Sequence, residues 1–147
     1  MKNPFKPKHI GAGYLLRWHL IPRNRFFNIY LHKFIGNDDE RALHDHPWAS
    51  ISIKLKGRVV EHYMATALEQ WIGGYYHLFP VKRRFVDILT IRPADFAHRL
   101  ELVGNKPAWT IFITGPVKRE WGFHCKKGWQ HWSTMTTKDG KTIGGCE

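Results

Sequence analysis

The sequence contains little cysteine and no long apolar run. Two of its 147 residues are cysteines, Cys125 and Cys146, which are too few for the disulfide framework of a small secreted domain. Residues 1–8 are charged and interrupted by proline, so we expect no secretory signal. No apolar stretch approaches the roughly 18 residues that a membrane helix needs. These absences favour a cytoplasmic protein without a membrane segment.

Acidic residues are also scarce. The chain has 12 Asp and Glu residues against 23 Lys and Arg residues, which gives a formal net charge of +11. Such a balance favours anionic partners, including nucleic acid. However, no helix-turn-helix, zinc-finger or RNA-recognition pattern accompanies the charge. We therefore expect a solvated basic surface, and nucleic-acid binding is the weaker interpretation.

Several catalytic signatures are missing. The sequence has no Gly-x-Ser-x-Gly elbow and no reactive-cysteine context, which argues against nucleophilic catalysis. It has no Gly-x-Gly-x-x-Gly or Walker loop for phosphate groups. The His-x-Asp pattern of oxoglutarate oxygenases is absent as well, because His46 stands two residues after His44. The chemistry of this chain must therefore rest on other side chains.

Short runs of strand-forming residues are abundant. We expect a single domain over residues 1–147, with an irregular basic arm at 1–13 and a tail at 118–147. Short strands bounded by turn residues, with no persuasive long helix, indicate an all-β sandwich or barrel. The predicted strands cover residues 14–21, 26–35, 49–55, 58–64, 75–79, 84–92, 96–103 and 108–115.

The run Leu43-His44-Asp45-His46-Pro47 dominates the functional interpretation. Two histidines two residues apart point the same way on a strand, so His44 and His46 can approach one metal ion together. Neutral imidazole is a common ligand for zinc, iron, copper and nickel. The best candidate for a third ligand is His98. Three protein ligands leave open positions for water, substrate or dioxygen.

This histidine pair resembles the first motif of the cupin superfamily. His44-x-His46, followed by Ser50 and Gly57, has the spacing of that motif. Ser50 stands where a glutamate normally follows the second histidine, and Asp38 replaces the glycine expected before the first. The resemblance therefore leaves a fourth, carboxylate ligand open.

Pro93-x-Asp95-x-x-His98 is similar to the second cupin motif, although Asp95 replaces a glycine and Leu102 replaces a frequent asparagine. The resemblance covers about residues 14–117. It is closest to small single-domain cupins of unknown function, some of them encoded by phages. It implies a double-stranded β-helix, or jelly-roll barrel, and a homodimer formed by pairing sheets. It also implies a divalent metal (Fe, Zn, Ni or Mn) on the three histidines.

Several residues near the three histidines have both a functional and a purely structural interpretation. Glu61 and His62 follow Gly57 on a predicted strand, and we name both as candidate catalytic residues. Glu61 could replace the missing carboxylate or act as a general base, but an exposed glutamate is narrowly favoured. Asp45 and Asp95 could each fix an imidazole tautomer, although turn formation is the favoured role.

The tail is rich in aromatic residues. We expect its tryptophans, Trp121, Trp129 and Trp132, to form core or lid. A second zinc site could be assembled there, but the spacing matches no zinc-finger pattern. Its ligands would be His124, Cys125, His131 and Cys146.

Three functions fit these residues. The first is a metal-dependent enzyme acting on a small molecule, most simply an oxygenase and otherwise an isomerase or lyase. The second is a non-catalytic cupin that binds a small anionic or sugar ligand, with Arg41, Arg99 and the tail aromatics lining its pocket. The third is an accessory module, such as a phage would encode, that binds nucleic acid or protein through its basic surface.

Overall fold

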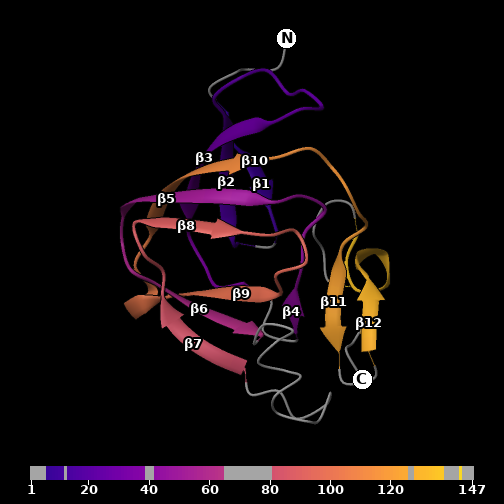
Figure 1. Cartoon of the computed structure of the whole chain (residues 1–147). Coiled ribbons are helices and arrows are strands. Elements are labelled where there is room, and N and C mark those ends of the chain that lie inside the picture. The colour runs from indigo at the N-terminus through magenta and orange to yellow at the C-terminus, as the bar shows by residue number, and fades with distance from the viewer. Residues whose placement is uncertain are drawn as a thin grey trace.

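The computed structural model of the chain describes residues 6–11, 13–38, 42–64, 81–125, 128–137 and 143. Over these residues the chain forms two six-stranded antiparallel sheets that face each other (Figure 1). The predicted all-β jelly roll is confirmed. The strand predicted at residues 75–79 lies outside the described residues.

The first sheet has the strand order β1-β2-β3-β10-β5-β8. Its central strand β10 pairs with β3 on one side and β5 on the other, which joins segments far apart in the sequence. The strands are β1 (Lys8–Ile10), β2 (Leu15–His19), β3 (Asn28–Phe34), β10 (Ala108–Thr114), β5 (Ser50–Lys56) and β8 (Leu89–Arg92).

The second sheet has the order β12-β11-β4-β9-β6-β7. In Figure 1 the β11–β12 hairpin stands beside the short strand β4. No helix among the described residues is long and apolar enough to cross a membrane. The strands are β12 (Gly128–His131), β11 (Gly122–Cys125), β4 (Leu43–His44), β9 (His98–Leu102), β6 (Val59–Met64) and β7 (Val81–Phe85), with 3-10 turns η1 (Val103–Asn105) and η2 (Trp132–Thr134).

The run 84–92, predicted as one strand, belongs to both sheets. β7 ends at Phe85 in the second sheet and β8 begins at Leu89 in the first. The backbone N–H of Val86 donates to the Val59 carbonyl at 2.9 Å, so the chain leaves the second sheet only after that bond. Strand propensity is high throughout this run, and propensity alone cannot show where a chain changes sheets.

The described parts of the N-terminal arm and of the tail are more regular than predicted. The arm at 1–13 contains β1, which pairs with β2 at the edge of the first sheet. The tail contributes the β11–β12 hairpin, and β11 extends the second sheet by pairing with β4. The tail is therefore part of the barrel that surrounds the histidines.

A turn at Gly57 joins β5 to β6. Its φ is +92°, a conformation that residues with a side chain rarely adopt. A Cβ at this position would lie 2.7 Å from the Ala108 Cα. The apolar core packs around this end of the barrel, and its buried members are Leu15, Phe34, Val59, Val86, Leu102 and Ala108.

The strand β5 turns its polar residues inward. Ser50 and Ser52 are buried, whereas Ile51 and Ile53 are only half-buried and Leu55 is exposed. The interior next to the histidines is therefore polar, and an aliphatic surface is left on the outside of the first sheet.

Candidate metal centre and its cavity

Three histidines converge on one point: one lies on β4, one just after β4 and one on β9. His44 lies on β4 and is the direct cross-strand partner of His98 on β9. His46 follows two residues after His44, as the alternation of a strand predicts. The potential ligand atoms of the three side chains all lie within 4.8 Å of one another. The structure thus brings together the three residues that the sequence analysis named as metal ligands.

Two of the three histidines, His46 and His98, are held in the neutral form that binds metals. Burial lowers the pKa of His98 to about 4, although its hydrogen bond to Glu61 acts in the opposite direction. Burial and the neighbouring histidines lower the pKa of His46 well below its usual value. A metal ion therefore need not displace protons from these two imidazoles at neutral pH.

Glu61 bonds to the Nδ1 side of the His98 ring. The Oε1 atom of Glu61 lies 2.6 Å from His98 Nδ1 and 2.6 Å from Arg92 Nε, and its Oε2 atom lies 2.8 Å from Arg84 Nε. Burial alone would raise the pKa of Glu61, but the His98 hydrogen bond and the Arg92 charge lower it well below its usual value. The carboxylate therefore accepts the Nδ1–H of His98 and leaves Nε2 for a metal.

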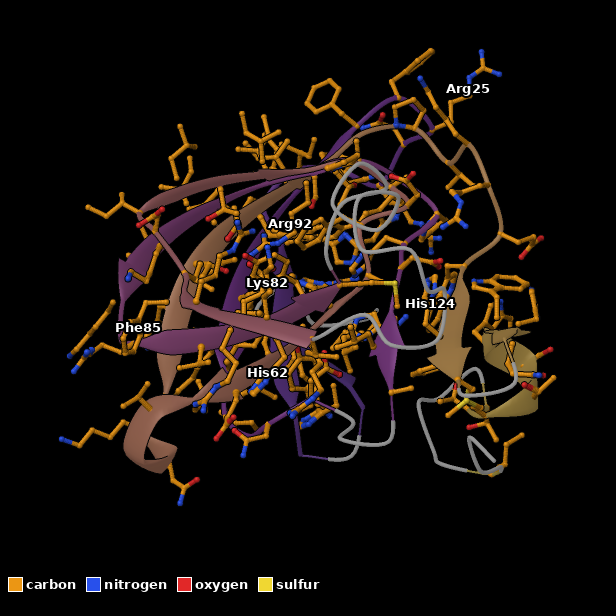
Figure 2. The ribbon with its side chains drawn as sticks, turned by 60° about the horizontal axis from the view of Figure 1, so that its bottom comes forward. Arg25, His62, Lys82, Phe85, Arg92 and His124 are labelled. Atoms are coloured by element: carbon orange, nitrogen blue, oxygen red, sulfur yellow. The ribbon has the colours of Figure 1, made fainter. Side chains whose placement is uncertain are left out.

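The narrowly favoured expectation of an exposed Glu61 was wrong. Its side chain is fully buried, and it contacts one of the three histidines. Arg92, which compensates its charge, lies between the two sheets (Figure 2). The alternation of a strand allowed either face, and only the pairing of β6 with β9 decides that Glu61 faces inward.

A second carboxylate stands behind His44. Asp38 Oδ2 lies 3.5 Å from His44 Nδ1, and both side chains are largely buried. Burial raises the pKa of Tyr14, and a hydrogen bond from its hydroxyl to Asp38 adds to the shift. Asp38 was predicted only as a replacement for a motif glycine and not as a site residue. An acidic residue in the loop that leads into the histidine motif is the signal in the sequence that could have indicated this role.

His46 is oriented by packing. Its ring stacks on Trp48 with centroids 4.9 Å apart and an interplanar angle of 21°. Its backbone N–H donates to the Ala94 carbonyl at 2.9 Å, and its carbonyl accepts from Arg119 Nη1 at 3.2 Å. These contacts fix the backbone on both sides of the ring.

His62 follows Glu61 and lies on the other face of β6. Its Nε2 atom lies 2.7 Å from Glu101 Oε2. It is not among the residues that line the cavity at the three histidines. The structure therefore separates the two candidate catalytic residues and places only Glu61 against a histidine of the site.

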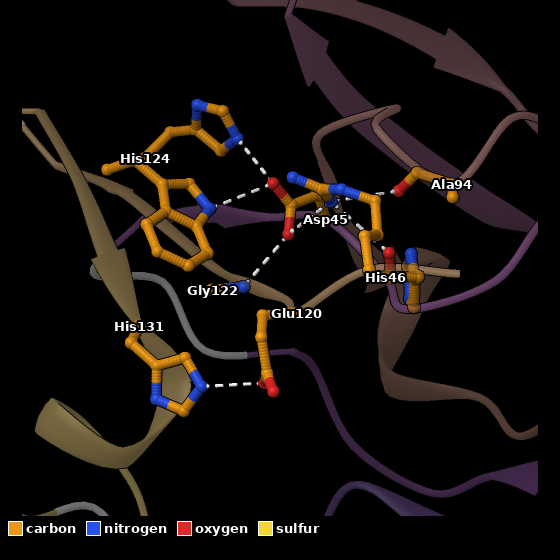
Figure 3. Close-up of polar contacts among 9 residues, drawn as sticks. Asp45, His46, Ala94, Glu120, Gly122, His124 and His131 are labelled. Atoms are coloured by element: carbon orange, nitrogen blue, oxygen red, sulfur yellow. Dashed lines mark hydrogen bonds and ion pairs between the residues drawn. The ribbon is translucent and has the colours of Figure 1, made fainter. Parts of the chain in front are cut away.

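Asp45 anchors the tail. It is almost completely buried and accepts hydrogen bonds from Gly122 N at 2.8 Å and from His124 Nε2 and Trp129 Nε1, both at 3.0 Å (Figure 3). Arg119 forms an ion pair with the same carboxylate, in which its Nη1 atom lies 3.0 Å from Asp45 Oδ1. The favoured turn role of Asp45 was therefore wrong, since this side chain ties the β11–β12 hairpin to the histidine motif.

Asp95 lies in the turn at residues 94–95 and is exposed, as favoured. Within the part of the chain that the structure describes, the ligands named for a second zinc site do not come together. His124 contacts Asp45, and His131 Nε2 lies 2.8 Å from Glu120 Oε2 (Figure 3). Cys125 is disulfide-bonded and offers no thiolate, while Cys146 lies outside the described residues. Among the described residues, His44, His46 and His98 form the group of potential metal ligands that the geometry brings together.

The histidines open into a cavity of about 340 Å³ between the two sheets. Trp121 lines it and stacks on Trp132, with centroids 6.1 Å apart, so part of the tail forms a wall as expected. Arg99 does not line it, and Arg41 lies outside the described residues. Its cationic lining residues are Arg17, Lys54 and Arg92, and its aromatic ones include Phe34, Trp48 and Phe112.

Comparison with known proteins rests on structure alone, because no family model and no curated protein matches the sequence. A cupin-like protein from Thermotoga maritima aligns with 83% of this chain and 88% of its own, at 13% identity and a TM-score of 0.56. A conserved protein with a double-stranded β-helix domain from Klebsiella pneumoniae aligns with 84% and 89%, at 12% identity and a TM-score of 0.52.

The vicilin of Solanum melongena is also similar, at 9% identity and a TM-score of 0.56. The alignment covers 82% of this chain and 33% of the vicilin, whose structure revealed different anionic ligands in structurally similar pockets. Identities this low show a shared fold. Two facing antiparallel sheets, with histidines on β4 and β9 at the positions of the two cupin motifs, agree with that likeness. The chain has the cupin fold, a double-stranded β-helix.

Proposed function

We propose that this chain is a metal-dependent cupin enzyme, of oxygenase or isomerase type, that acts on a small molecule in the cavity between its sheets. The observation that carries the proposal is the convergence of His44, His46 and His98 on one cavity wall. A bound Fe, Zn, Ni or Mn ion would supply Lewis-acid or redox chemistry there, with positions left open for a substrate.

The donor set fits such an ion. Nitrogen ligands at about 2.1 Å from one metal lie at most about 4.2 Å apart. The potential ligand atoms lie within 4.8 Å, so small side-chain movements would close the set around an ion. Neutral imidazoles suit these metals, and burial keeps His46 and His98 neutral through lowered pKa values.

Glu61 and Asp38 would act as positioning residues. Glu61 fixes the orientation of His98 and raises its basicity by accepting its Nδ1–H. Asp38 Oδ2 lies 3.5 Å from His44 Nδ1 with no hydrogen bond between these two atoms, so it would act on His44 through its charge. A catalytic role for His62 stays a prediction, because its ring contacts Glu101 on the other face of β6.

The proposed activity can be tested by depletion of a substrate. Protein loaded anaerobically with Fe(II), Mn(II), Ni(II) or Zn(II) would be incubated with a metabolite extract, and mass spectrometry would follow each compound. We expect one small molecule to be consumed by the wild type and not by a variant with His44, His46 and His98 all changed to alanine. If no compound changes with any of the four metals, the enzymatic part of the proposal fails.

A cupin that binds a ligand without converting it is the second candidate. The cavity lining favours it, because Arg17 and Lys54 can hold an anion whether or not a metal is present. Anionic ligands in structurally similar pockets are also described for the vicilin. A compound that raises the melting temperature of the protein but is recovered unchanged with every metal would favour this candidate.

We also propose that the chain forms a homodimer through the outside of its first sheet. Ile91 and Leu89 on β8 are 69% and 58% exposed, and they continue rows of aliphatic residues across β5, β10 and β3. Contiguous apolar surface of this kind marks interfaces. Ile91→Lys should shift the protein from dimer to monomer in sedimentation velocity, and a wild type that is monomeric at high concentration would contradict this proposal.

A further inference from the structure

A row of polar side chains crosses the first sheet opposite the histidines. In the strand pairing, Arg17 on β2 is the partner of His32 on β3, His32 is the partner of Thr110 on β10, and Thr110 is the partner of Lys54 on β5. Residues in register on adjacent strands point to the same face of a sheet. All four line the cavity, so we call them the Arg17–Lys54 row.

The two cations of this row have neutral partners. Arg17 Nε donates to His32 Nε2 at 2.9 Å, and Lys54 Nζ donates to the Val86 carbonyl at 2.8 Å. In the described part of the chain, neither cation has a carboxylate within ion-pair distance. Arg92 differs, because Glu61 compensates its charge.

The histidine in the row, His32, does not compensate the positive charges of Arg17 and Lys54. His32 is almost completely buried, and burial and the Arg17 charge lower its pKa well below the usual value. It is neutral and uses Nε2 to accept the Arg17 hydrogen bond. That bond occupies Nε and leaves the Nη atoms of Arg17, which form the end of the guanidinium that can grip an oxyanion.

Thr110 adds a buried polar group without a partner. Its side chain is 4% exposed, and its Oγ1 atom makes no hydrogen bond. Buried hydroxyls nearly always have a partner, so an unpaired one that lines a cavity between two cations marks a place for a ligand atom. An oxyanion would accept this hydroxyl proton together with the donors of Arg17 and Lys54.

The remaining lining sets the size and character of the ligand. The cavity volume of about 340 Å³ suits a small metabolite. Phe112 packs on His32 with ring centroids 4.8 Å apart, and Trp48 packs on His46 with centroids 4.9 Å apart. These rings form an apolar surface between the Arg17–Lys54 row and the metal centre. The cavity thus offers cations at one wall, aromatic rings between the walls, and three imidazoles at the other wall.

We propose that the Arg17–Lys54 row is an oxyanion subsite, which binds the carboxylate or phosphate group of a small organic substrate and directs its other end to the three histidines. The orientation toward the histidines rests on the proposed function. The binding of the oxyanion does not, because all of its donors belong to the first sheet. The substrate class is therefore a small organic acid or phosphate ester with a compact apolar body.

The experiment uses full-length protein from which metal has been removed with a chelator, so that an anion cannot bind through a metal. Isothermal titration calorimetry would measure the affinity for two probes, benzoate and inorganic phosphate. Lys54→Met and Arg17→Met remove the two cations, and Thr110→Val removes the hydroxyl at nearly constant volume. Their matched controls are Lys56→Met, at an exposed position of β5, and Arg25→Met, at an exposed position on the periphery of the molecule (Figure 2).

We expect at least one probe to bind. Each cation variant should weaken binding about tenfold or more, Thr110→Val about threefold, and each control less than twofold. Binding of benzoate alone assigns the subsite to carboxylic acids, and binding of phosphate alone assigns it to phosphate esters. The proposal is overturned if neither probe binds, or if the controls weaken binding as much as the cavity variants. Anion binding without metal uptake would refute the metal centre and leave this subsite standing.

Discussion

The two walls of the cavity differ in how their polar groups are compensated. On the wall formed by β4 and β9, the His98 imidazole bonds to the Glu61 carboxylate, and Asp38 stands behind His44. On the opposite wall, Arg17 donates to a neutral imidazole and lies over the Tyr30 ring, and Lys54 donates to a backbone carbonyl. On the first wall the charges of Glu61 and Arg92 are therefore balanced before any ligand arrives, whereas the other wall carries positive charge toward the cavity.

This difference predicts opposite responses to mutation. Removing a member of a compensated buried cluster leaves a charge without its partner, which is costly. Removing a cation that has no anionic partner takes away a charge whose burial was unfavourable, so the folded state loses little. Stability measurements on the two walls can therefore test the comparison without any knowledge of the substrate.

The largest effect is expected at Glu61. Glu61→Ala would leave Arg92 buried without its carboxylate and His98 without its acceptor. We expect the free energy of unfolding to fall by about 3–5 kcal/mol, measured by urea denaturation. Glu101→Ala is the control, because this carboxylate is half-exposed and should cost about 1 kcal/mol or less. Equal losses in the two variants would show that the Glu61 cluster does not stabilise the wall.

The second-largest loss of stability is expected at Asp45. This residue lies next to the metal centre, but its side chain bonds to residues of the tail. Asp45→Ala removes the acceptor of Gly122 N, His124 and Trp129. We expect a loss of about 2–3 kcal/mol, with faster proteolysis at the β11–β12 hairpin. Hydrogen exchange would locate the change. Exchange that speeds up across β9 as strongly as in β11 would contradict the role of Asp45 as a local anchor.

An intermediate effect is expected from the titration of His32. Its folded-state pKa is depressed, so as pH falls below about 6.5 the unfolded chain binds a proton that the folded chain does not. The free energy of unfolding therefore falls by up to about 1.4 kcal/mol per pH unit in this window. His32→Gln keeps an acceptor for Arg17 but cannot titrate, so its stability should fall less steeply between pH 6.5 and 5. Parallel curves for the two proteins would refute the assignment.

The smallest effect is expected at Arg17. Its guanidinium is largely covered, and burial lowers its pKa from the usual value. Because no carboxylate among the described residues compensates it, Arg17→Met should change the free energy of unfolding by about 1 kcal/mol or less in the absence of ligand. A loss comparable to that of Glu61→Ala, measured in the same urea titrations, would remove the difference between the two walls.

Much of the fold could be predicted from local patterns. β5 alternates Ser50-Ile51-Ser52-Ile53, and the turn at Gly57 follows it, so the strand and its end were visible in the sequence. Counted from His44 and His46, the same alternation predicts that Ser50 and Ser52 share the face of the histidine pair, and both are buried. Alternation along one strand does not show that the neighbouring strand also turns a polar residue toward the cavity, as Thr110 on β10 does.

The candidate site was predictable where spacing carries the information. His44 on β4 and His46 just after it are two residues apart, and strand alternation places their side chains on the same side. The Arg17–Lys54 row could not be found in this way, because its members come from four strands that become neighbours only in the folded sheet. Glu61 was visible as a candidate, but its contact with His98 depends on the pairing of β6 with β9.

The most direct test of the metal centre is the metal content of the purified protein. Elemental mass spectrometry would compare untagged wild type with a variant in which His44, His46 and His98 are all changed to alanine. We predict near-stoichiometric divalent metal in the wild type and none in the variant, with both proteins folded by circular dichroism. The absence of metal from the wild type, even after anaerobic reconstitution with Fe(II), would contradict the account.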